Sequence, residues 1–290
     1  ALNLLKSPAN EAGKKLAAVK TKEALVSDPN NPVLIELLYN IQHPEILFPT
    51  ETLRDLFNKN YLAGNTIVFS LQRKNRDYPG IVLVRDTAGN FVRINNQLFA
   101  VPQLAKSATT LPGYLRNGNT PEGIFRMDGF DTSASNFIGP TTNIQLTLPF
   151  EYSARHFFRD SSLTDTSWNI DLYKKQLPAS LQNYFPLYET WYAGKSGRNE
   201  IIAHGTTIDP SYYKNKPYYP LTPTLGCLCT KEIWNDETGR LAESDQQLLV
   251  NALLKAGGPN GYLLVINLDD QQKPVDISEI INFLPPPNHN

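Results

Sequence analysis

The residues best placed to do chemistry are a histidine and a cysteine in the last third of the chain. His204 and Gly205 follow the apolar run IIA, and Thr224, Gly226 and Cys227 follow in the segment TPTLGC. A thiol with the ordinary pKa of about 8.5 is mostly protonated at neutral pH, so a cysteine nucleophile needs an imidazole to take its proton. The pattern therefore predicts a nucleophile, Cys227, with His204 as its base.

Structural interpretations of the same residues stay open, because a free cysteine is usually a small buried hydrophobe and a lone histidine usually a hydrogen-bonding residue. A zinc site would draw on Cys227, Cys229, His204 and His156. A Cys-x-Cys pair without a second pair of ligands is a weak metal signal, and a disulfide within it would be strained. We therefore expect neither a metal nor a disulfide.

The composition indicates a globular protein and argues against two other classes, nucleic-acid-binding and membrane-spanning proteins. The chain has 290 residues, 41% of them hydrophobic, enough for one large domain or for a catalytic domain with a smaller appendage. A net charge of -1 lacks the basic excess of a nucleic-acid-binding protein. No apolar run approaches the roughly 20 residues of a membrane-spanning helix, so no transmembrane segment is expected.

The pattern of apolar and turn-forming residues divides the chain into three parts. Residues 1–62 carry apolar residues at helical spacing, with breaks at Asp28-Pro29 and His43-Pro44. Residues 63–270 alternate short β-rich runs with turns, and a helix is expected over 243–256. Residues 271–290 form a tail. The sequence thus predicts a mainly β (α+β) domain with peripheral helices, preceded by a small helical region.

The expected strands are short and separated by turn residues. The turn at 86–90 predicts a hairpin, since Gly89 and Asn90 tolerate positive φ. The runs read as strands are TIVFSLQ, GIVLVRD, FVRIN, LFAVPQL, TPEGIFRMDGF, NIQLTLPF, EIIAH and GYLLVINL.

Two ordered motifs carry a family resemblance. The order strand, His-Gly, loop, Thr-x-Gly-Cys resembles the signature of the L,D-transpeptidase catalytic domain, and Thr120-Pro121-Glu122-Gly123-Ile124-Phe125 resembles the Thr-Pro-x-Gly-x-Phe segment that precedes it in that family. The resemblance covers roughly residues 65–268. It implies a YkuD-type β-sandwich fold.

The resemblance also implies site residues and roles. Cys227 matches the acyl-accepting nucleophile and His204 the general base, while Thr224, Leu225 and Gly226 form the turn whose backbone N–H groups would stabilise an oxyanion. The family needs no cofactor, and a backbone carbonyl holds its histidine in one tautomer. Asp209 is therefore expected to form a turn rather than to join a triad.

This chain departs from the family pattern in the substrate-binding part of the site. Cys229 stands where the family has an arginine, and we expect Arg126 to supply the missing charge, with Arg155 and Arg159 as the next candidates. Gly205 and Tyr219 are further candidates for substrate binding. Tyr219 lies in the long, tyrosine-rich segment 205–226, whose rings either stack on substrate or pack the loop.

The implied function is acyl transfer from peptidoglycan stem peptides through a thioester on Cys227. Two alternatives remain: a carboxypeptidase or amide hydrolase on the same scaffold, and a non-catalytic wall-binding module. The resemblance implies an extracytoplasmic location. Removal of a signal peptide would account for a chain that begins at Ala1 rather than at Met, and a trimmed N-terminus would do so equally well. No oligomeric state is implied.

Overall fold

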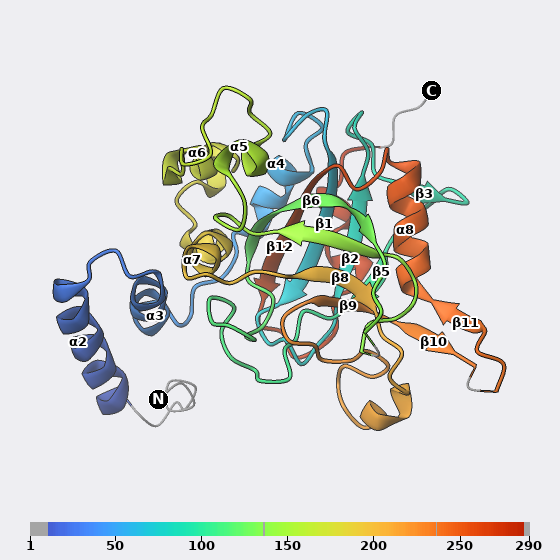
Figure 1. The fold of residues 1–290 in the computed structure, drawn as a ribbon, viewed down its shortest axis with the longest axis horizontal. Coiled ribbons are helices and arrows are strands. Elements are labelled where there is room, and N and C mark those ends of the chain that lie inside the picture. The colour runs from blue at the N-terminus through green and yellow to red at the C-terminus, as the bar shows by residue number, and fades with distance from the viewer. Residues whose placement is uncertain (1–10, 136, 236, 287–290) are drawn as a thin grey trace.

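One large sheet organises the protein (Figure 1). The computed structural model describes residues 11–135, 137–235 and 237–286. The strand order in the sheet is β5-β2-β1-β12-β6-β7-β8-β9, and two small hairpins, β3-β4 and β10-β11, stand apart from it. The strands are β1 Thr66–Arg73, β2 Gly80–Arg85, β3 Arg93–Ile94, β4 Gln97–Leu98, β5 Val101–Gln103, β6 Gly123–Asp131, β7 Asn143–Thr147, β8 Ile202–Gly205, β9 Leu228–Thr230, β10 Glu232–Trp234, β11 Leu241–Ser244 and β12 Gly261–Asp269.

The sheet nearly closes on itself. Its two outer strands meet where Leu104, just after β5, exchanges two backbone hydrogen bonds of 2.8 Å with Cys229 on β9. The β8-β9 and β1-β12 pairs are parallel, and the other pairs in the sheet are antiparallel. Cys229 therefore lies in the closure, and the turn before it enters the sheet at this seam.

Both faces of the sheet are covered, which explains why β1 is buried at every position and carries apolar residues on both faces. On β1, Ile67 and Phe69 pack into one core with α4 to α7, while Val68 packs into a second core with α8. The helices are α2 Glu11–Ser27, α3 Pro32–Gln42, α4 Leu53–Phe57, α5 Ala154–Phe158, α6 Ile170–Lys175, α7 Glu189–Lys195 and α8 Asp245–Lys255, and the short 3-10 turns are η1 Thr50–Thr52, η2 Ala179–Leu181, η3 Phe185–Tyr188, η4 Pro210–Tyr213, η5 Ile277–Glu279 and η6 Ile281–Phe283.

Several local predictions are confirmed. The helix expected over 243–256 is α8, capped by Ser244, whose side chain accepts the Gln247 N–H. The turn at 86–90 is a hairpin in which Gly89 has φ +88°. A sheet-based domain with helices around it is also confirmed. The finer prediction of a two-sheet sandwich is not, because the strand order describes one nearly closed sheet.

The expectation of β texture up to the end of the domain is wrong for residues 154–195. This stretch forms α5, α6, α7 and 3-10 turns over the sheet, so the protein is mixed α/β. Its rings provide the reason. Trp191 packs against both Trp168 and Tyr173, with ring centroids 5.9 and 5.7 Å apart. Aromatic residues favour strands when read alone, but here their packing onto the sheet decides the structure.

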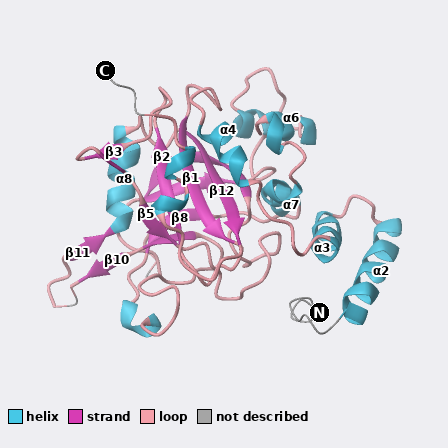
Figure 2. Ribbon diagram, turned by 180° about the vertical axis from the view of Figure 1, so that it is seen from behind, coloured by secondary structure: helices cyan, strands magenta, loops and turns pink. Residues whose placement is uncertain are grey.

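The N-terminal helices lie to one side of the sheet (Figures 1 and 2). Asn31 caps α3 by accepting the N–H groups of Val33 and Leu34, both at 3.1 Å. The helix attaches to the body through Tyr39, whose ring stacks on Phe185 with centroids 4.0 Å apart. Farther along, α4 contributes its apolar residues to the main core of the sheet. The helical region thus connects into the domain at α4.

Two buried carboxyl groups, Glu36 and Glu122, and the partly buried Glu189 meet where α3 joins the body. Burial, together with the charges of Glu189 and Glu122, raises the pKa of Glu36 well above its usual range. Burial likewise raises the pKa of Glu189, and it raises that of Glu122 to about 8 against the opposing hydrogen bonds from Asn267. The charges of the buried Arg76 and Arg198 act in the opposite direction on Glu189. The folded protein therefore retains protons here at neutral pH.

We expect the free energy of unfolding to fall as pH rises from about 4.3 to about 8. A carboxyl group whose pKa is higher in the folded state binds more protons there than in the unfolded chain, whose carboxyl groups titrate near 4.3. The stabilisation is complete below this window and is lost through it. Urea unfolding at pH 5, 7 and 9 measures the slope. Glu122→Gln should flatten it, whereas the exposed Glu23→Gln should not.

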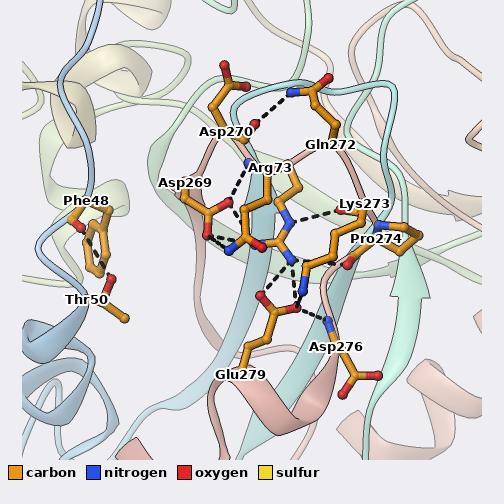
Figure 3. A network of polar contacts seen from close by, with 11 residues as sticks. Phe48, Thr50, Arg73, Asp269, Asp270, Gln272, Lys273, Pro274, Asp276 and Glu279 are labelled. Atoms are coloured by element: carbon orange, nitrogen blue, oxygen red, sulfur yellow. Dashed lines mark hydrogen bonds and ion pairs between the residues drawn. The ribbon is translucent and has the colours of Figure 1, made fainter.

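Arg73 fastens the C-terminal segment to the sheet (Figure 3). Its buried guanidinium lies 2.8 Å from Asp269 and 2.7 Å from Glu279. It also donates to the carbonyl oxygens of Lys273 and Pro274, at 3.0 and 3.1 Å. The Arg73 side chain thus links Asp269, at the end of β12, to Glu279 in η5.

Replacing Arg73 with methionine should destabilise the protein by about 3–5 kcal/mol, because two partly buried carboxylates lose their cation. Chemical denaturation measures the change. Lys20→Met is the matched control, since Lys20 pairs with Glu23 at 2.7 Å on the exposed face of α2. It should have little effect. Equal effects of the two variants would contradict this role for Arg73.

Candidate functional site

The turn that carries Cys227 is closed by its own threonine. Thr224 Oγ1 accepts the Gly226 N–H at 3.0 Å and donates to the Cys227 carbonyl at 2.8 Å. Thr120, from the Thr-Pro-x-Gly motif, donates to the Gly226 carbonyl at 2.9 Å. The two sequence motifs therefore meet at the turn. The Gly226 N–H is used inside it, while the Leu225 side chain is exposed.

Gly226 is required by its surroundings as well as by its backbone. Its φ is +122°, a region that side-chain-bearing residues rarely adopt. A Cβ there would lie 2.0 Å from Arg198 Nη2 and 2.7 Å from the Gly118 carbonyl oxygen. The guanidinium of Arg198 thus lies directly against the residue before Cys227.

Cys227 is half-buried, and its sulfur sits in a mixed electrostatic environment. Sγ lies 3.9 Å from the Glu200 carbonyl oxygen. Burial raises the pKa of the Cys227 thiol, and the Glu200 charge adds to the effect. A backbone hydrogen bond from Ile202 and the charge of Arg198 act in the opposite direction. Burial prevails, so the resting thiol is protonated.

His204 is buried and oriented by a backbone carbonyl. Nδ1 lies 2.6 Å from the Gly205 oxygen, which also accepts the Gly139 N–H at 2.8 Å. A carbonyl oxygen only accepts hydrogen bonds, so Nδ1 carries the proton and Nε2 presents a lone pair. Burial lowers the pKa of His204, opposed by this hydrogen bond. The imidazole is therefore neutral at physiological pH, as a general base must be.

His204 lies on β8, and Cys227 lies in the turn immediately before the neighbouring parallel strand β9. His204 on β8 is the register partner of Cys229 on β9, two residues beyond Cys227. Register partners on neighbouring strands share a face, so the side chains of His204 and Cys229 lie on the same side of this strand pair. No hydrogen bond between described side chains joins His204 to Cys227. The predicted contact between base and nucleophile stays a prediction, since such contacts are often loose before substrate binds.

Gly205 makes room for a buried acid. A Cβ at Gly205 would lie 1.7 Å from Glu232 Oε2. The other oxygen of Glu232 accepts hydrogen bonds from Trp234 Nε1 at 2.9 Å and from the Thr141 N–H at 3.2 Å. The structure thus gives Gly205 a packing role beside His204. The predicted substrate contact at Gly205 stays a prediction.

Cys229 is a core residue. It is fully buried with Leu104 and Leu221, against which Tyr218 packs. Burial raises the pKa of its thiol to about 12. Cys229 is therefore unsuited to act as a nucleophile at neutral pH, and an arginine at this position would have to enter an apolar cluster.

The three arginines predicted to replace the missing charge make their contacts elsewhere. Arg126 Nε lies 2.8 Å from Asp128, which also contacts His156 Nε2 at 2.8 Å. Arg155 donates to the Leu163 carbonyl, and Arg159 to Asn65 and to the Asn260 carbonyl. The cation whose charge acts on Cys227 is instead Arg198, which the sequence analysis missed.

The tyrosine-rich loop divides into packed and exposed rings. Tyr213 and Tyr218 pack with their centroids 5.3 Å apart, and Lys106 Nζ lies 5.6 Å from the Tyr218 ring centroid. Tyr212 and Tyr219 are exposed, at 79% and 43%. Tyr213 and Tyr218 therefore pack the loop, whereas the Tyr219 ring stays accessible to a ligand. Asp209 forms a turn, as expected, by accepting the Ser211 N–H at 2.8 Å.

The zinc alternative finds no site. His156 is engaged by Asp128, and the described residues contain no cluster of three or more His, Cys, Asp or Glu side chains that could hold a metal ion.

Comparisons with known proteins give no relative for this chain. No family model, no curated protein and no solved structure matches it. Within residues 11–135, 137–235 and 237–286, no helix has the length and apolar character needed to cross a membrane.

Proposed function

We propose that this chain is a cysteine acyltransferase of the L,D-transpeptidase type, acting outside the cytoplasm on peptidoglycan stem peptides. Cys227 is the nucleophile and His204 its general base. The observation that carries the proposal is the 2.6 Å contact of His204 Nδ1 with the Gly205 carbonyl, which leaves Nε2 as a base on the strand beside the Cys227 turn.

The chemistry follows from the resting protonation states. At rest the Cys227 thiol is protonated and the His204 imidazole is neutral. Substrate binding therefore precedes proton transfer from Cys227 Sγ to His204 Nε2. The thiolate then attacks the amide carbonyl. The tetrahedral intermediate collapses to a thioester as the imidazolium returns its proton to the leaving amine. A second amine attacks the thioester, loses its proton to His204 and regenerates the thiol.

As part of the same proposal, we take the domain to be related to YkuD-type catalytic domains. The support for this relation is the order of the two motifs along the chain and the hydrogen bond by which Thr120, in the first motif, holds the Gly226 carbonyl in the second. A residue distant in sequence thus helps to hold the turn that carries Cys227, and acyl transfer depends on such fixed orientation of the reacting groups. Tyr219, which is exposed, remains a candidate substrate contact, whereas Arg126 is paired with Asp128.

The test uses purified tetrapeptide-containing muropeptides and mass spectrometry. The parent should release the terminal D-alanine and form cross-linked dimers, and Cys227→Ala should do neither. Trimmed tripeptides without dimers would instead identify water as the acceptor and the protein as a carboxypeptidase. A parent that leaves the muropeptides unchanged but co-sediments with cell-wall sacculi would support the non-catalytic binding module.

A further inference from the structure

Arg198 is a buried cation with an unusual set of partners. It lies just before β8, in the segment that leads into the His204 strand. It donates to the carbonyl oxygens of Asn119 and Gly118, each at 2.8 Å, and to that of Gly113. None of these hydrogen-bonding partners is a carboxylate, although the charge of the nearby Glu189 favours the charged guanidinium. Burial nevertheless lowers the pKa of Arg198 to about 10, so the guanidinium is still charged at neutral pH.

The position of Arg198 connects the loop of the first motif to the nucleophile turn. The three carbonyls belong to the loop that ends at Thr120, and Thr120 holds the Gly226 carbonyl. Nη2 fills the space that a side chain at Gly226 would occupy. Arg198 therefore packs between the loop and the residue that precedes Cys227.

The charges around the Cys227 sulfur make the same guanidinium important for its chemistry. Two charged side chains act on the thiol: Arg198 favours the thiolate and Glu200 disfavours it. Both lie on the short segment that precedes β8. The position two residues beyond the nucleophile is occupied by Cys229 in its apolar cluster, so no cation comes from β9.

We propose that Arg198 is a positioning residue that fixes the Cys227 turn and stabilises the Cys227 thiolate from behind Gly226. The inference rests on the proposed function only in taking Cys227 as the nucleophile. It gives the site an internal cation that comes from before the histidine strand, whereas the family pattern places an arginine after the cysteine.

The test is the pH dependence of Cys227 alkylation by iodoacetamide, followed by peptide mapping so that Cys229 does not contribute. Arg198→Lys and Arg198→Gln form a matched pair, because both side chains end in N–H donors and differ in charge. The midpoint of Arg198→Gln should rise by about one pH unit or more, since a nearby opposite charge shifts a pKa by about 1–3 units. Its rate at pH 7 should fall about tenfold, while the limiting rate at high pH stays near that of the parent.

Arg198→Lys should keep a midpoint close to that of the parent, and Glu200→Gln should lower it. A folded Arg198→Gln protein with an unchanged midpoint would overturn the proposal. So would an Arg198→Lys midpoint as high as that of Arg198→Gln, because the charge would then be irrelevant.

A measurement on the parent covers the case in which Arg198→Gln does not fold. The ¹⁵N resonance of Arg198 Nε should titrate with the alkylation midpoint and lose this titration once Cys227 is capped. A flat resonance would overturn the proposal. Neither experiment uses peptidoglycan, so a failure on muropeptides would count against the proposed function and leave this inference standing.

Discussion

Replacing Cys227 with alanine should abolish acyl transfer, lowering the rate of D-alanine release by a factor of about 10⁴ or more, because no other group at the turn can form the covalent intermediate. Cys229→Ser is the matched control. The two cysteines lie two residues apart, Cys227 in the turn and Cys229 on β9, but Cys229 is enclosed by Leu104 and Leu221. Cys229→Ser should therefore lose some stability and retain most of the activity.

The opposite ranking of these two variants would assign the nucleophile to Cys229. Equal and modest losses in both would indicate that neither thiol reacts. Cys229→Arg would not test the missing family arginine, since it would place an unpaired cation among apolar side chains and destabilise the closure of the sheet.

Replacing His204 with asparagine should lower kcat/KM by a factor of about 10² to 10⁴. The pH profile should also change in a definite direction. Burial lowers the pKa of His204, so the parent should already be active at slightly acidic pH. Without His204, only those molecules in which Cys227 has lost its proton to solvent can react. The rate of the variant should then keep rising with pH above the ordinary thiol pKa of about 8.5, because burial raises the pKa of Cys227.

Stopped-flow or discontinuous assays from pH 5 to 10 measure both profiles, with circular dichroism to confirm that the variant is folded. His156→Asn is the control histidine, since its Nε2 lies 2.8 Å from Asp128 rather than near the Cys227 turn. If His204→Asn reacted with the parent's pH profile, another group would have to act as the base.

The parts of the site that sequence predicted are those encoded within a few residues of one another. The apolar run before His204, the Thr-x-Gly-Cys turn and the glycine at 226 each follow from local rules. The structure shows the contacts behind them: Thr224 closes the turn, and Gly226 has the positive φ that its residue type permits.

The remaining features depend on contacts between distant segments. Arg198 precedes a strand without any motif, and its importance arises only when the loop of Gly118 folds over it. Glu232 lies behind Gly205 because β10 follows the closing strand. No spacing rule links such residues. The family pattern also directed attention to charges such as Arg126 rather than to Arg198.

The helices over 154–195 show the same limit for the fold. Their aromatic residues read as strand formers one at a time, yet they form a layer of rings on the sheet. Ser153 and Asn169 were the available local signals, since each caps the helix that follows it by accepting a backbone N–H.

Trapping the acyl-enzyme tests directly whether Cys227 is the nucleophile. The parent should be incubated with a carbapenem, digested and mapped by mass spectrometry, with Cys227→Ala and His204→Asn treated in parallel. We expect a covalent adduct on Cys227 in the parent, slower formation in His204→Asn and none in Cys227→Ala. An adduct on another residue, or an unmodified Cys227 in a parent that turns over muropeptides, would contradict this role for Cys227.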